Sequence, residues 1–147
     1  MIEISKSQEA LAPTEKVWQV LSDLENEQKY WTGLRNVKIL RKKDDLTVER
    51  EATIKRGPMG EAKSLQTLTI DPSTKTSTLT MMKGPVLGSR KITLSSMDGD
   101  KKTKIQVHWQ FELKGVPGFA QGFVKDNISE VTEKALAAIA EESQRRK

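Results

Sequence analysis

The feature that most constrains the fold is a change of hydrophobic period near residue 115. From residue 102 to 113, apolar and polar residues alternate, which predicts a strand with one buried and one wetted face. After Gly115 the spacing becomes helical for about 25 residues, so the helix spans a whole domain and its apolar face must lie across a sheet. The predicted apolar stripe of this helix contains Phe119, Phe123, Val124, Ile128, Val131, Ala135, Ala138 and Ile139.

The alternating pattern extends back to residue 35 and predicts an antiparallel meander. Its expected strands are residues 36–42, 46–55, 62–70, 76–83, 90–97 and 102–113. Before them we expect a short strand at residues 2–4, a helix opened by Pro13, and a short helix from Asp23 to a left-handed C-terminal residue at Gly33. The fold class is therefore α+β, with one curved sheet gripping one long helix. We expect a single domain over residues 1–147, with 143–147 as a frayed tail.

Composition excludes several classes of function. The chain has no cysteine and a single histidine, His108, so we expect neither a metal site nor a cofactor. Its net charge of +5 is scattered, and the basic runs at 41–43 and 145–147 lack interleaved aromatic residues, so we expect no nucleic-acid partner. The sequence has no apolar run of membrane-spanning length and no secretory signal, which favours the cytoplasm.

The turns of the meander differ between its two ends. Turns at residues 43–45, 71–74 and 98–100 are short and polar, as hairpin connections usually are. The segments at 57–60, 84–88 and 115–119 are instead bracketed by glycine and proline and carry apolar residues. This end predicts an apolar rim and movable gate loops around a ligand pocket. The alternative is that these residues only close the core.

Several residues are candidates to line or rim this pocket. Strand alternation places Arg50 and Arg90 on inward faces, where an acidic or carbonyl-bearing ligand headgroup would meet them. The alternatives are a bulge that reverses the register, or a core glutamate that pairs with each arginine. The candidate ligand-binding residues are Tyr30, Trp31, Arg50, Met59, Met81, Val86, Leu87, Arg90, Trp109, Phe119 and Phe123.

Particular segments carry a family resemblance that covers essentially the whole chain. These segments are residues 12–18, 21–23, 30–31, 84–85, 103–109, 115–117 and 135–140. With them the chain resembles the START-related helix-grip superfamily, and most of all its polyketide cyclase/dehydrase-type branch, which shares the fold of pollen-allergen-like proteins. The resemblance implies a ligand pocket but transfers no catalytic residue to this sequence.

Three functional interpretations remain open. We favour a non-catalytic binder or carrier of a hydrophobic small molecule, such as a lipid, an isoprenoid or a polycyclic compound. The second interpretation is a cyclase or dehydratase that polarises carbonyl groups with Tyr30, Arg50 or Arg90. The third is a protein-interaction module that docks a partner protein through the apolar gate loops, which would also allow transient contact with a membrane.

Overall fold

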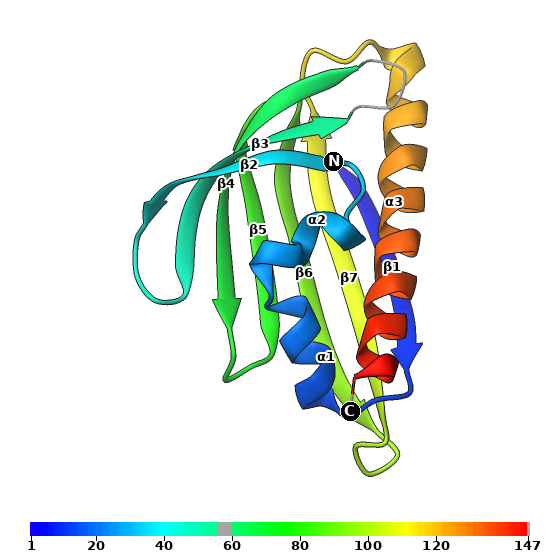
Figure 1. Ribbon diagram of the computed structural model, residues 1–147. Coiled ribbons are helices and arrows are strands. Elements are labelled where there is room, and N and C mark those ends of the chain that lie inside the picture. The colour runs from blue at the N-terminus through cyan, green and yellow to red at the C-terminus, as the bar shows by residue number, and fades with distance from the viewer. Residues whose placement is uncertain (56–59, 147) are drawn as a thin grey trace.

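One curved antiparallel sheet wraps around a long helix (Figure 1). The computed structural model describes residues 1–55 and 60–146. The elements follow in the order β1 (Ile2–Ala10), α1 (Thr14–Leu21), the 3₁₀ helix η1 (Leu24–Asn26), α2 (Glu27–Tyr30), β2 (Leu34–Lys42), β3 (Thr47–Lys55), β4 (Glu61–Asp71), β5 (Thr76–Lys83), β6 (Val86–Met97), β7 (Lys102–Leu113) and α3 (Gly118–Arg145). Among these residues seven strands form the sheet, in the order β1-β7-β6-β5-β4-β3-β2. The predicted α+β helix-grip fold is confirmed.

The strand β7 follows its sequence pattern closely. Ile105, Val107 and Phe111 are fully buried, whereas His108 and Gln110 between them are exposed. β7 pairs with β6 along its whole length and with β1 on its other side. β7 is therefore an interior strand of the sheet, and its apolar face belongs to the main core.

The first strand is longer than the sequence predicts. β1 reaches Ala10, and each of its residues is paired with β7, from Ile2 opposite Phe111 to Ala10 opposite Thr103. Residues 5–9 are polar, so their strand conformation is set by pairing with β7 and not by an apolar face of their own. Pro13 then precedes the helix α1, as predicted, and Val17 and Val20 of that helix are buried.

The expected loop at residues 84–88 is mostly strand. Val86 and Leu87 pair with Leu113 and Glu112 at the start of β6, which leaves Gly84 and Pro85 as the turn. Gly88 has a φ of 149°, and a Cβ there would overlap the carbonyl oxygen of Gln110 on β7. The pairing of β6 with β7 and the close approach of their backbones at Gly88 hold residues 86–88 in the sheet. The prediction of a gate loop at residues 84–88 is therefore wrong.

The helix α3 buries a different stripe at its start than the sequence predicts. Val124, which the predicted stripe contains, is buried, but it packs with Ala120 and Val116 in a small second cluster. Phe119 and Phe123 are 83% and 61% exposed, because the turn of about 100° per residue places them on a neighbouring face. Their prediction as buried stripe residues is wrong.

The later part of α3 agrees with the predicted stripe but extends further. Ala135 and Ile139 are buried, together with Leu136 on the same side. The helix continues to Arg145 with Ser143 fully buried, so residues 143–145, expected to fray, are helical. Gly33 was expected to be left-handed, but its φ is not positive, so that prediction is wrong.

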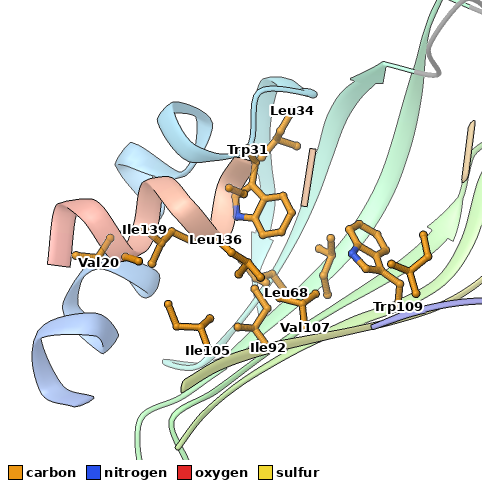
Figure 2. Close-up of a cluster of buried hydrophobic side chains, with 14 of the residues drawn as sticks. Val20, Trp31, Leu34, Leu68, Ile92, Ile105, Val107, Trp109, Leu136 and Ile139 are labelled. Carbon is orange, nitrogen blue, oxygen red and sulfur yellow. The ribbon is translucent and has the colours of Figure 1, made fainter. Parts of the chain in front are cut away.

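The main core fills the space between the sheet and the helices. Figure 2 shows Leu136 and Ile139 of α3 and Val20 of α1 directed toward Ile92 and Ile105 of the sheet. All five side chains are almost completely buried. At about 25 cal/mol per Å² of apolar surface, this burial is the main source of the fold's stability. Within the part of the chain that the structure describes, no helix is both long and apolar enough to cross a membrane.

Candidate functional site

A buried ion pair connects the short helix α2 to the sheet. Arg50 on β3 is 1% exposed, and its guanidinium donates two hydrogen bonds to the Glu27 carboxylate, Nη1 to Oε1 at 2.5 Å and Nη2 to Oε2 at 3.1 Å. The Nε of Arg50 donates a third hydrogen bond to Oε1 of Gln66 at 2.9 Å. Gln66 in turn donates to Oγ of the buried Ser64 at 3.2 Å. Because a bidentate carboxylate satisfies a guanidinium well, Glu27 neutralises Arg50.

Arg90 on β6 shares the same carboxylate but is held less tightly. Its Nη2 lies 3.9 Å from Oε2 of Glu27, which is too long for a hydrogen bond, and its Nε is buried without a partner among the described residues. Its guanidinium carbon lies 4.3 Å from the ring centre of Trp31 and 5.7 Å from that of Trp109. Burial lowers the pKa of Arg90 to about 10, although the Glu27 carboxylate opposes this change and Arg50 adds to it.

Two indole rings form the apolar wall beside Arg90. The rings of Trp31 and Trp109 meet edge to face with their centres 6.4 Å apart (Figure 2). The Nε1 of Trp109 donates a hydrogen bond to Oγ1 of Thr132 on α3 at 3.0 Å, and Thr132 is itself fully buried. This bond ties the position of the Trp109 ring to α3 and leaves its face free for apolar contact.

These residues surround a cavity of about 80 Å³ between the concave face of the sheet and α3. At roughly 10–15 Å³ for one water, this volume holds on the order of six water-sized groups, about the size of one ring or a short alkyl chain. The wall consists of Trp31, Gly33, Leu34, Arg50, Ile54, Gln66, Leu79, Met81, Val86, Arg90, Trp109, Val124, Asn127, Ile128 and Val131. A charged cluster thus lies against an otherwise largely apolar wall.

Of the ten predicted site residues that the structure describes, six lie on this wall and four lie elsewhere. Those on the wall are Trp31, Arg50, Met81, Val86, Arg90 and Trp109. Leu87, Phe119 and Phe123 lie off the wall. Tyr30 lies instead beside Glu142 of α3 and Arg146, which directly follows that helix. Burial raises the pKa of Tyr30, with a further increase from Glu142. Met59 lies outside the described residues.

Sequence reasoning missed Glu27, the residue that organises the cluster. It allowed for a core glutamate beside the arginines but did not identify one. Glu27 precedes Trp31 by four residues and follows Leu24 by three, so helical spacing places all three on one side of the short helix. This helical spacing is the sequence feature that could have identified Glu27 as an inward-facing residue. Thr132 was missed in the same way, since it lies between the stripe residues Ile128 and Ala135.

The curved sheet, the long helix across it and the cavity between them together define a START-related helix-grip protein. Residues 1–144 match the family model described as "Polyketide cyclase / dehydrase and lipid transport", so the chain belongs to this family. No curated protein matches the sequence.

Solved structures share the fold at low sequence identity. The Zhui aromatase/cyclase from Streptomyces sp. R1128 has a TM-score of 0.86 at 15% identity, covering 99% of this chain and 94% of that one. A START superfamily protein from Mycobacterium smegmatis has a TM-score of 0.74 at 19% identity, covering 95% and 97%. The di-domain ARO/CYC StfQ from the steffimycin biosynthetic pathway has a TM-score of 0.68 at 14% identity, covering 97% of this chain and 44% of that one. At these identities the likeness concerns the fold alone.

Proposed function

We propose that this chain binds and carries a hydrophobic small molecule in the cavity between the sheet and α3. The observation that supports the proposal most is an internal space walled by Trp31, Trp109 and aliphatic side chains. A largely apolar wall of this kind favours an apolar ligand, because binding removes the apolar surface of the ligand from water. The description of the family, which includes lipid transport, agrees with this assignment.

The volume of the cavity limits the size of the ligand group that it holds. With room for about six non-hydrogen atoms and about 0.8 kcal/mol for each buried CH₂, apolar burial contributes roughly 5 kcal/mol before ordering costs. That corresponds to a dissociation constant near the millimolar range. The bound group is therefore a small molecule or one end of a longer one, and tighter binding needs either a wider cavity or a polar anchor.

A cyclase or dehydratase function is a second candidate, supported by the aromatase/cyclase names of structural neighbours. That mechanism requires Tyr30, Arg50 or Arg90 to polarise substrate carbonyl groups. Tyr30 lies off the cavity wall, and Arg50 is already bonded to Glu27. Only Arg90 keeps a position suited to polarising a carbonyl, so binding is the better supported function. Conversion of a poly-β-ketone by the purified protein would favour the enzyme.

Two measurements test the binding function. Native mass spectrometry of the purified protein is expected to detect a co-purifying hydrophobic molecule. Titration with toluene is expected to shift the indole N–H resonance of Trp109 saturably. In Val131→Phe, where the larger ring occupies the cavity, the shift should disappear, whereas Ala137→Phe, on the exposed side of α3, should leave it unchanged. The proposal fails if no molecule co-purifies and toluene produces no saturable shift.

A further inference from the structure

The charges around the cavity do not balance. Its wall includes two guanidinium groups, Arg50 and Arg90, and no carboxylate, lysine or histidine among the described residues. The carboxylate that approaches both arginines is Glu27, which is 7% exposed and contacts Arg50 in a bidentate manner. Two positive charges and one negative charge leave an excess of one positive charge on three almost completely buried side chains.

The excess charge resides on Arg90. Arg50 has the short contacts with Glu27 and a hydrogen bond to Gln66, whereas Arg90 approaches Glu27 only to 3.9 Å. Arg90 is 4% exposed, and its Nε has no acceptor among the described residues. A buried charged group that lacks hydrogen bonds is costly, and such groups are normally satisfied by a partner.

We propose that the ligand of this cavity is a monoanion whose carboxylate or equivalent oxygen group is bound beside Arg90, with its apolar part against Trp31 and Trp109. The inference rests on the proposed binding function and deepens it by naming the chemical class of ligand. One negative charge matches the one excess positive charge, so a singly charged group fits better than a phosphate dianion. A charged acceptor also forms a shorter and stronger hydrogen bond with a guanidinium than a neutral one does.

The indole rings alone are a weaker partner for this charge. Trp31 lies close enough to Arg90 for a cation–π contact, but a ring face offers no acceptor for the Nε–H. The contact holds the guanidinium side chain in place beside the cavity. The cation–π contact therefore positions the Arg90 guanidinium to bind an anion, but it does not supply the hydrogen-bond acceptor that an anion would supply.

Hexanoate and hexanamide provide a matched pair of probes, since they have the same chain length and differ mainly in charge. We expect wild-type protein, followed by the Trp109 indole resonance, to bind hexanoate at least about tenfold more tightly than hexanamide. Lowering the pH until the probe's own carboxyl group is protonated should abolish this preference. Hexanamide binding should be unaffected by the same change.

Variants assign the preference to one residue. In Arg90→Met the two probes should bind within about twofold of each other, and in Arg35→Met, which changes an exposed arginine on β2, the tenfold preference should remain. Neither substitution removes a group of the Glu27–Arg50 pair. Equal affinity of wild-type protein for the two probes would overturn the anion inference while the binding function stood. Persistence of the preference in Arg90→Met would overturn the assignment to Arg90. If neither probe binds, the anion inference is overturned, whereas the binding function is decided by the toluene titration and native mass spectrometry.

Discussion

Removal of the Arg90 charge should stabilise the ligand-free protein. A pKa lowered to about 10 by burial corresponds to roughly 3 kcal/mol of lost stability while Arg90 is charged. Arg90→Met relieves this cost and fills the same space with an apolar chain, but it loses the contact with Trp31, which is worth about 1–2 kcal/mol. The expected result is a net gain of about 1–2 kcal/mol in the free energy of unfolding.

Urea denaturation at several pH values measures this effect. Because the pKa of Arg90 is lower in the folded protein than in the unfolded chain, the unfolded chain binds more protons above pH 10. The stability advantage of Arg90→Met should therefore be complete at pH 7–9 and shrink as the pH rises above about 10. Arg35→Met should stay within about 0.5 kcal/mol of wild type. A loss of more than about 1 kcal/mol in Arg90→Met would refute the reasoning.

Two further predictions concern the ion pair and the sheet, and both are measured by urea denaturation. Glu27→Gln should cost about 3–5 kcal/mol because it leaves two buried guanidinium groups without a carboxylate. Glu51→Gln, which removes an exposed pair with a lysine 3.7 Å away, should cost less than about 1 kcal/mol, and equal losses would contradict the argument. Gly88→Ala should cost about 3 kcal/mol because its Cβ would collide with the backbone of β7. Gly99 also has a positive φ, but the space around it is open, so Gly99→Ala adds backbone strain without a collision. If Gly99→Ala lost as much stability as Gly88→Ala, backbone strain alone would account for the cost.

The strands were predictable wherever an apolar face repeats along the sequence. The expected strand at residues 102–113 matches β7 to the residue, and that at 76–83 matches β5. β1 was underestimated because the residues after Ile4 have no apolar periodicity, and their conformation depends on a partner about a hundred residues away in the chain. Local pattern contains no information about such a partner.

The cavity wall was predictable in part. Strand alternation correctly placed Arg50 and Arg90 on the buried face of the sheet. Side chains two residues apart on a strand share a face, so both arginines lie on the same side as their apolar neighbours. Phe119 and Phe123 were misplaced because hydrophobic character alone does not determine which face of α3 meets the sheet at its first turns. The role of Glu27 depends on how α2 packs over β3 and β6, which is a tertiary arrangement with only a weak trace in helical spacing.

The pairing of β1 with β7 has a consequence for synthesis on the ribosome. Ser5 and His108, which face each other across these two strands, are 103 positions apart in the chain. At about 5–20 residues per second, the ribosome needs on the order of ten seconds to supply the partner of the first strand. During that time the nascent N-terminal segment has an open hydrogen-bonding edge, and closure of the sheet is among the last steps of folding.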